Sequence, residues 1–351
     1  MKIDLAKLAN ASKLLFSIPL KPLQGSRFQP TGFPGLGAAT FQTAGNVNLL
    51  VESHQSMANR LESVAWDEVV KAPKADLAGL SYVRVERQKK YLTSSMTEAH
   101  RLNSPYILNG SDRTFFDEFL NRLKEELGSA LISDNEGNVN HHKLCKVVFE
   151  FDVSSLIHGL FLSNKVSHAP KKKPESISGG RLRIARALSA FIEASGVKQA
   201  ISGGVKNDQV NPSGSTKEGF GNVPFSREEY TADSITLFVN LDLAQIRGYG
   251  LDEKATQMLI LLALYKIRAL VDGDLRLRTA CDFEVVSSEI KASKPTDFVL
   301  PTLSVIVAEL KAAIAACKDQ MKVTTVAFND ELKKGSDKEE KSASDEQDGN
   351  D

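Results

Sequence analysis

Alternation of apolar and polar residues along the chain predicts several β-strands. The clearest is residues 234–243, in which every second residue is apolar and most of the residues between are polar. The same two-residue period predicts the other strands, which are residues 14–20, 82–86, 147–153 and 277–286. Pro19 and Pro22 restrict the first of these to an edge or an end of a sheet.

Apolar residues spaced three and four apart predict helices. The predicted helices are residues 53–65, 112–128, 181–194 and 251–271, and a last helix begins at Pro301. Residues 251–271 are apolar on almost every side, so we expect a buried helix, with Asp252 and Glu253 at its N-terminal end. The strands and helices do not follow a regular βαβ alternation, which indicates an α+β fold.

Three segments between these elements are predicted to be insertions in a single domain of residues 1–330. They are residues 66–110, 163–180 and 196–230. The last is rich in glycine, asparagine and proline and is too long for a simple connection, and long insertions of this kind usually have a function. Residues 331–351 are polar and charged, so we expect this tail to be disordered.

The distribution of charge along the chain bears only on local binding surfaces. The formal net charge is zero, with 44 basic and 44 acidic residues. Residues 331–351 hold eight acidic residues and four lysines, so the tail is acidic and the body is mildly basic. A mildly basic body is compatible with a local phosphate-binding stripe, although it does not require one.

The remaining composition indicates a cytoplasmic protein without a membrane segment. Cys145, Cys281 and Cys317 are far apart and lack metal-ligand spacing, so we expect reduced core thiols. The N-terminus is charged throughout, unlike a signal peptide. The longest apolar run, residues 258–265, is too short to span a bilayer.

Catalytic and cofactor motifs are missing from the sequence. It contains no P-loop, no H-E-x-x-H and no G-x-S-x-G, and its six histidines form no metal-binding pattern. His158 lies among apolar residues and is expected to be a hydrogen-bonded core histidine. His54 could act as a general base, but the sequence supplies no partner for it. We therefore expect binding rather than catalysis, with no cofactor and no metal.

Residues 23–61 combine features that suit an anion. Gln24, Arg27 and Gln29 lie on an extended run, and the glycines that follow let backbone amides approach a ligand closely. A helix then begins at Ser53, and its first turns carry Gln55, Ser56, Asn59 and Arg60. Helix N-termini and loop amides hold phosphates without side-chain charge, so this stretch is a candidate anion cradle. The alternative is a merely solvated polar face.

Several long motifs resemble one protein family. They are RFQPTGFPGLGAATFQ (27–42), LVESHQSMANRLE (50–62), LIHGLFL (156–162), GGRLRIARALSAFIEASG (179–196), GGVKNDQVNPSG (203–214), GFGNVPFSREEYTA (219–232), NLDLAQIRGYGL (240–251) and LALYKIRALVDGDLRLRTACDFEV (262–285). In this order they resemble the backbone subunit of type I-G (formerly I-U) CRISPR effector complexes, the Csb family of the repeat-associated mysterious protein (RAMP) superfamily.

The resemblance implies an RNA-recognition-motif-like, ferredoxin-type antiparallel sheet with helices on one face and long insertions. It also implies a non-catalytic subunit that polymerises along CRISPR guide RNA in a Cascade surveillance complex and presents the guide for pairing with target DNA in antiviral defence. The implied partners are guide RNA, target DNA, other copies of this chain, and the large and fused guide-end/processing subunits. An extended hairpin, the thumb, enters the guide at intervals; residues 196–230 are our candidate for it, and residues 66–110 are the alternative.

The resemblance further implies which residues bind RNA. They are Gln24, Arg27, Ser56, Asn59, Arg60, Arg181, Arg183, Lys206, Asn207, Arg247 and Arg278. Such residues need only grip phosphate and sugar, because base pairing reads the sequence. Tyr249 and Arg268 lie in matching motifs too and are equally compatible with a structural role.

Two other function classes remain open at this point. One is a RAMP-type ribonuclease that acts on guide precursor or target RNA. Processing relatives carry a glycine-rich loop near the C-terminus, where this chain has a predicted helix and an acidic tail. The other class is a scaffold that binds no nucleic acid.

Overall fold

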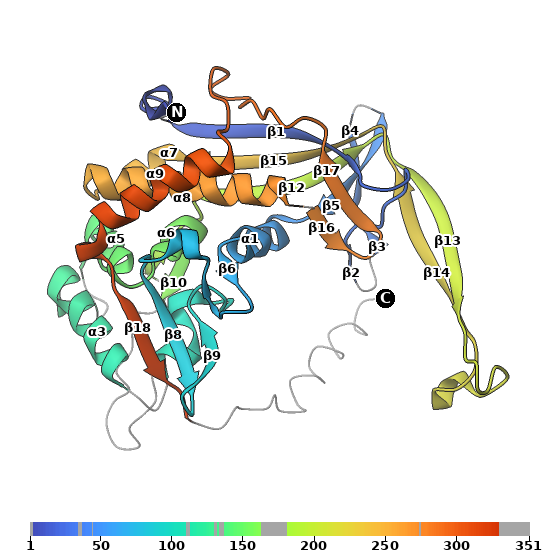
Figure 1. The fold of residues 1–351 in the computed structure, drawn as a ribbon, viewed down its shortest axis with the longest axis horizontal. Coiled ribbons are helices and arrows are strands. Elements are labelled where there is room, and N and C mark those ends of the chain that lie inside the picture. Colours follow the sequence, from blue (N-terminus) through green and yellow to red (C-terminus); the bar gives the residue numbers. More distant parts are fainter. Residues whose placement is uncertain are drawn as a thin grey trace.

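A curled antiparallel sheet of seven strands is the largest element of the fold (Figure 1). The computed structural model describes residues 3–33, 37–43, 45–109, 113–129, 132, 137–162, 181–273 and 275–329. In sheet order the strands are β16 (Leu275–Arg278), β17 (Cys281–Val285), β1 (Lys13–Pro22), β15 (Ser234–Asp242), β12 (Leu188–Ser195), β5 (Asn46–Glu52) and β4 (Thr40–Thr43). Helices accompany this sheet, so the fold is mixed α+β, as predicted.

The central strands place their apolar residues on one face of this sheet. Phe16 on β1 pairs with Val239 on β15, and both side chains are buried. Their neighbours Ser17 and Phe238 pair on the opposite face and are at least partly accessible. The two-residue period therefore separates a core face from an outer face, and the strand predicted at residues 234–243 is confirmed.

Helices cover the core face of the sheet. Figure 1 shows them in front of the strands: α1 (His54–Ser63), α7 (Leu243–Arg247), α8 (Glu253–Asp272) and α9 (Leu303–Ala316). Asp252 caps α8 by accepting from the amide of Ala255 at 2.8 Å, and Ser53 caps α1 in the same way. The helices predicted at residues 53–65 and 251–271 are confirmed, and α8 is buried on nearly every side.

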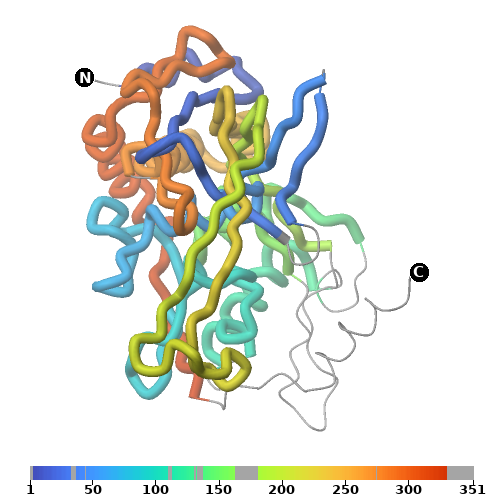
Figure 2. Tube along the Cα trace, turned by 90° about the vertical axis from the view of Figure 1, so that its right-hand side faces the viewer, coloured from blue at the N-terminus to red at the C-terminus, as the bar shows by residue number. Residues whose placement is uncertain are grey.

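A long hairpin extends from the body (Figures 1 and 2). It consists of β13 (Lys198–Lys206) and β14 (Val223–Thr231), which pair without interruption from Lys198 opposite Thr231 to Lys206 opposite Val223. In Figure 1 the hairpin runs down the right-hand side, and Figure 2 shows it from that side, in front of the body. The segment at residues 196–230 is thus a regular two-stranded arm.

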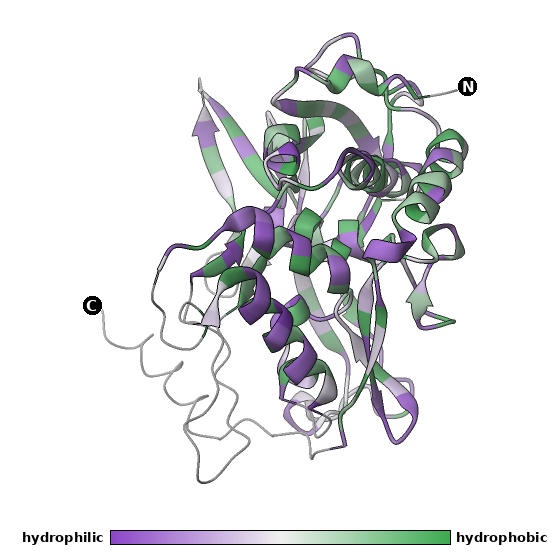
Figure 3. Ribbon diagram, turned by 90° about the vertical axis from the view of Figure 1, so that its left-hand side faces the viewer, coloured by the Kyte–Doolittle hydropathy of each residue, from purple (hydrophilic) through white to green (hydrophobic). Residues whose placement is uncertain are grey.

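A second layer lies on the other side of α8 (Figure 1). Its helices are α2 (Pro105–Leu108), α3 (Thr114–Leu127), α5 (His141–Phe151) and α6 (Val153–His158), and its sheet has the order β18 (Val323–Ala327), β8 (Tyr82–Arg87) and β9 (Lys90–Ser94). Figure 3 shows hydrophilic positions on the outward side of these helices. Their apolar sides meet inside, where Phe119 on α3 packs edge-to-face on Phe151 of α5.

Short elements complete the described chain. They are η1 (Leu5–Leu8), β2 (Gly32–Phe33), β3 (Gly37–Ala38), β6 (Trp66–Asp67), β7 (Ala72–Pro73), η2 (Ala75–Leu77), η3 (Arg101–Asn103), β10 (Leu160–Leu162), β11 (Leu182–Ile184), η4 (Thr216–Glu218) and η5 (Lys318–Gln320). The basic loop predicted at residues 163–180 and the tail at residues 331–351 lie outside the described residues.

Two predicted elements have the wrong type. Residues 147–153 were expected to form a strand, but they belong to the end of α5 and the start of α6. Residues 181–194 were expected to form a helix, but they form β11 and most of β12. α5 is apolar on most sides, so alternate residues of it also look like a strand. β12 lies between β15 and β5, where hydrogen bonding at both edges outweighs a helix-like spacing.

One predicted strand is in fact a hairpin. Residues 277–286 contain the end of β16, a turn and β17, which pair antiparallel. Ala280 turns the chain with a positive φ of 59°, a conformation that sequence patterns do not reveal for alanine. The prediction of one continuous strand is therefore wrong.

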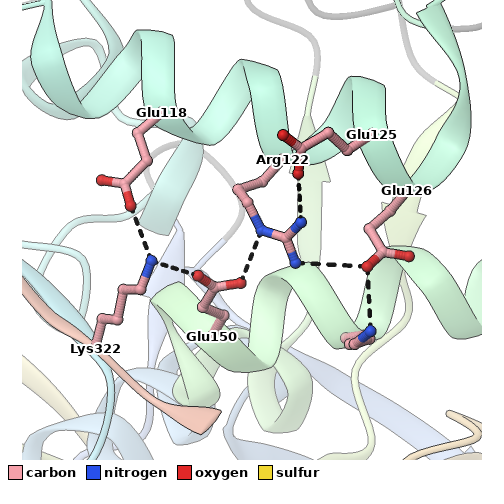
Figure 4. A network of polar contacts seen from close by, with 7 residues as sticks. Glu118, Arg122, Glu125, Glu126, Glu150 and Lys322 are labelled. Atoms are coloured by element: carbon pink, nitrogen blue, oxygen red, sulfur yellow. Dashed lines mark hydrogen bonds and ion pairs between the residues drawn. The ribbon is translucent and has the colours of Figure 1, made fainter. Parts of the chain in front are cut away.

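A network of charged side chains joins the helices of the second layer to β18 (Figure 4). Arg122 on α3 contacts Glu150 on α5 at 3.1 Å and two further glutamates of its own helix. Lys322, just before β18, lies 2.6 Å from Glu150 and 2.9 Å from Glu118 on α3. Glu150 is only 16% exposed, so two cations from different elements share one carboxylate that is largely screened from water.

Arg122→Ala should test how much this network stabilises the fold. It removes a cation that three carboxylates share, and we expect the free energy of unfolding to fall by about 1–2 kcal/mol and the melting temperature by roughly 2–6 °C. Lys146→Ala is the control, since Lys146 contacts only Glu126 of this network and is 65% exposed. Calorimetry that showed equal losses for the two variants would contradict a central role for Arg122.

Candidate nucleic-acid interface

A buried carboxylate, Glu52, lies at the centre of the opening stretch. It ends β5, and only 2% of its side chain is exposed. Arg278 of β16 forms a close ion pair with it, and Arg60 of α1 approaches it at 3.6 Å. Ionised groups in such a place are stable only when they are paired and hydrogen-bonded.

Both arginines also hold backbone carbonyls. Arg60 donates to the carbonyl oxygens of Arg276, at 3.0 Å, and Leu277. Arg278 donates to those of Gln29, at 3.1 Å, and Val51, at 3.3 Å. Their guanidinium groups are therefore used inside the protein to join α1, β5 and β16. The contacts favour a structural role for Arg60 and Arg278, while RNA binding by either remains a prediction.

Beside this cluster, the opening stretch forms the base of the long hairpin. The backbone of Phe28 exchanges two hydrogen bonds of 2.9 Å with Tyr230 on β14. Arg27, whose side chain is 56% exposed, lies 3.4 Å from the carboxylate of Glu229. Gln24 and Arg27 also line a cleft of about 430 Å³ that reaches Asp282. Two of the predicted RNA contacts are thus accessible where the hairpin leaves the body.

The far end of the hairpin carries two more predicted contacts. Lys206 and Asn207 are exposed there. Asp208 organises the adjoining loop, because its carboxylate accepts from the amides of Val210, Asn211 and Gly221 at 2.8–3.0 Å. The same hydrogen bonds, that from Asn211 first, hold the pKa of Asp208 below its usual value. The tip is therefore preformed and presents its side chains to solvent.

Apolar side chains are unusually accessible along this hairpin. They include Ile201 (77% exposed), Val205 (54%), Val210 (95%), Phe220 (51%) and Phe225 (46%). Exposed apolar residues gathered on one element are typical of a surface that contacts a partner. The hairpin therefore carries accessible apolar surface along its length.

The other predicted residues lie in three places. Asn59 is exposed on α1 and accepts from Gln55 at 3.1 Å, and half-buried Ser56 is one turn away. Arg183 is exposed on β11, and Arg181 contacts the carbonyl of Gly137. Arg247 donates to the carbonyls of Leu8 and Ala11, which holds η1 on α7. The predicted residues therefore lie in separate places: on α1, at the base of the hairpin, at its tip, and, for Arg181 and Arg247, elsewhere on the body.

Tyr249 and Arg268 have structural contacts. The hydroxyl of Tyr249 donates to the carbonyl of Leu156 at 2.7 Å. Arg268 pairs with Asp272 at 2.7 Å and donates to the carbonyl of Ser288. Both side chains therefore fasten α7 and α8 to their surroundings.

Sequence patterns missed a buried ionisable cluster behind α1. Burial raises the pKa of the Asp152 carboxyl to about 6 and lowers that of the Lys266 ammonium to about 8. Burial also lowers the pKa of His158 well below its usual value. His158 is a core residue, but neither ring nitrogen has a hydrogen-bond partner among the described residues, so the expectation of a hydrogen-bonded histidine is wrong. These groups come together only in the folded protein, so no short sequence motif predicts the cluster.

Within the described ranges, no helix is long and apolar enough to cross a membrane. In the same part of the chain, no group of three His, Cys, Asp or Glu side chains is arranged to hold a metal ion.

Comparison with known proteins places the chain in a family. Residues 14–199, more than half of the sequence, match the family described as CRISPR-associated protein GSU0053. The protein is therefore a CRISPR-associated protein, and it belongs to the GSU0053 family. No curated protein matches the chain.

Two solved structures are similar at low identity. One is a chain titled "CRISPR RNA-guided surveillance complex, pre-nicking", with 12% identity and a TM-score of 0.36 over 80% of this chain and 75% of that one. The other is Thermofilum pendens Csc2, with 11% identity and a TM-score of 0.30 over 98% of this chain and 79% of that one.

Arg60→Ala should distinguish a structural from an RNA-binding role. Removing the guanidinium leaves two carbonyls and part of the Glu52 charge without a donor, so we expect a loss of about 2 kcal/mol in the free energy of unfolding. Arg276→Ala is the control, because its side chain is 74% exposed and lies 3.8 Å from Asp282. An unchanged melting temperature, together with a decrease of about one in the slope of log Kd for RNA against log salt, would instead show that Arg60 contacts a phosphate.

Asp152 should make the protein more stable at mildly acidic than at alkaline pH. Its pKa of about 6 in the folded protein lies above the ordinary 3.8, so the folded state holds the proton more tightly. This contribution is lost as pH rises through 6, and between pH 5 and pH 8 it amounts to about 1.4 kcal/mol. Urea unfolding of the parent protein and of Asp152→Asn at both pH values isolates the contribution of Asp152 to the pH dependence, because the other carboxylates titrate in both proteins. Identical pH dependence would refute the raised pKa.

Proposed function

We propose that the protein is a non-catalytic, guide-RNA-binding backbone subunit of a type I-G Cascade surveillance complex. In this proposal it polymerises along CRISPR RNA in the cytoplasm and presents the guide for pairing with target DNA. The observation that carries the proposal is the long hairpin of residues 198–231, which has a preformed tip, exposed apolar side chains and basic residues at both ends. Membership of a CRISPR-associated family supports the same reading.

The order of elements supports an RNA-recognition-motif-like core. Strand β1 is followed by α1, β12, β15, α8 and β17, and these strands lie in the order β17-β1-β15-β12. This is the β-α-β-β-α-β arrangement of ferredoxin-type folds. We infer that β4, β5 and β16 widen this core, that the hairpin and most of the second layer are insertions into it, and that β18 belongs to a C-terminal extension.

The RNA-binding roles divide between arm and body. We propose that Lys206 and Asn207 reach the guide from the hairpin tip, while Arg27 and Gln24 contact it near the hairpin base. Asn59 and Arg183 add exposed polar groups on the body. Contacts of this kind fix the path of the backbone and leave sequence reading to base pairing. The remaining partners are neighbouring copies of the chain and the large and guide-end/processing subunits.

Shortening the hairpin tests the proposal. Residues 205–224 would be replaced by Asn-Gly, which closes a two-stranded turn after Gly204 opposite Phe225. We expect a folded protein with a melting temperature within about 3 °C of the parent, because nothing in the body core is removed. Guide RNA co-purified with it should lose its regular pattern of nuclease protection. Unchanged protection would reject this hairpin as the thumb.

A matched pair of lysines tests which hairpin meets RNA. Lys206 is exposed on the long hairpin, and Lys90 is exposed on the β8–β9 hairpin within the alternative segment, residues 66–110. Lys206→Ala should reduce the slope of log Kd against log salt by about one, because one phosphate contact is lost. Lys90→Ala should leave it unchanged. The reverse result would move the thumb to residues 66–110.

A further inference from the structure

Three aromatic rings form a column on the outer face of the main sheet. Phe191 on β12 is the cross-strand partner of Phe238 on β15, and their ring centroids lie 5.0 Å apart at an interplanar angle of 23°. His54 continues the column, with its centroid 4.5 Å from that of Phe191 at 30°. The rings are therefore stacked across three elements, β15, β12 and the first residue of α1.

This column is accessible at its His54 end. His54 is exposed, whereas Phe191 and Phe238 are half-buried and support it from behind. His54 is also the first residue of α1, so the helix fixes its backbone while Phe191 fixes its ring. A flat side chain held in this way loses little conformational entropy when another flat group stacks against it.

A cation is hydrogen-bonded to the residue that carries this ring. Arg186 donates to the carbonyl oxygen of His54 at 3.3 Å and to the side-chain oxygen of Gln55 at 2.9 Å. Its Nε atom is buried and has no acceptor among the described residues. Positive charge and a supported aromatic face therefore occur together, and single-stranded nucleic acid offers the matching pair of a base and a phosphate.

We propose that His54, supported by Phe191 and Phe238, stacks against one unpaired base of single-stranded RNA, with Arg186 beside the adjoining phosphate. The inference rests on the proposed guide-binding function and adds a contact to a base face. Stacking tolerates every sequence, because each base has a π-face. Such a contact suits a subunit that has to hold guides of any sequence.

Two variants of His54 in the full chain test the stacking role. Binding would be measured by fluorescence anisotropy with a fluorescein-labelled oligoadenylate RNA at several salt concentrations. His54→Ala should weaken binding about tenfold, with an unchanged salt slope because a stacking contact rather than a phosphate contact is lost. His54→Phe should bind within about threefold of the parent, because it keeps the flat ring. Since His54 is exposed, we expect all variants to keep the parent's melting temperature.

His141→Ala is the matched control. His141 is also exposed and is also the first residue of a capped helix, α5, but it belongs to no described ring column. It should bind RNA as the parent does. Parent-like binding by His54→Ala, or a loss in His54→Phe as large as in His54→Ala, would overturn the stacking proposal and leave the guide-binding function standing. A parent protein that binds no RNA would overturn both.

Discussion

The pairing of Glu52 with Arg60 and Arg278 is the constraint on which the opening stretch depends. A buried carboxylate without a cation would cost several kcal/mol, so the two arginines cannot leave it freely. Because they come from α1 and β16, their charges hold a helix and a distant strand against the end of β5. Arg278 also binds the carbonyl of Gln29, next to the residue that pairs with the hairpin base. The ion cluster therefore helps to fix the backbone that pairs with the base of the hairpin.

Fold prediction from the sequence succeeded where one periodicity was unambiguous. β15 alternates except at Phe238, and α8 is apolar over too great a length to be a strand. It failed for α5 and β12, because a short apolar window fits both periods and only the neighbours in space decide between them. The positive φ of Ala280, which divides β16 from β17, depends on its surroundings and left no sequence signal.

The location of the site and the RNA-binding role of each of its residues remain predictions, but the structure shows how the predicted residues are arranged. The opening stretch and the hairpin were both singled out, and the structure joins them through Phe28 and Tyr230. The arginines were predicted to contact phosphate, but the planar set of N–H donors on arginine also suits clusters of backbone carbonyls. Arg60, Arg247 and Arg278 are used in that second way. The column of His54, Phe191 and Phe238 was missed because its rings come from three elements that no local pattern relates.

The parallel pairing of β18 with β8 affects how the protein is made. Residues 82–87 lie beside residues 323–327, so an edge of the sheet in the second layer stays open until nearly all of the described chain has left the ribosome. Lys322 and its two glutamate contacts also form only then. Unpaired strand edges attract other chains. Nascent copies on one messenger RNA are consequently exposed to mispairing through β8 until their own β18 covers it.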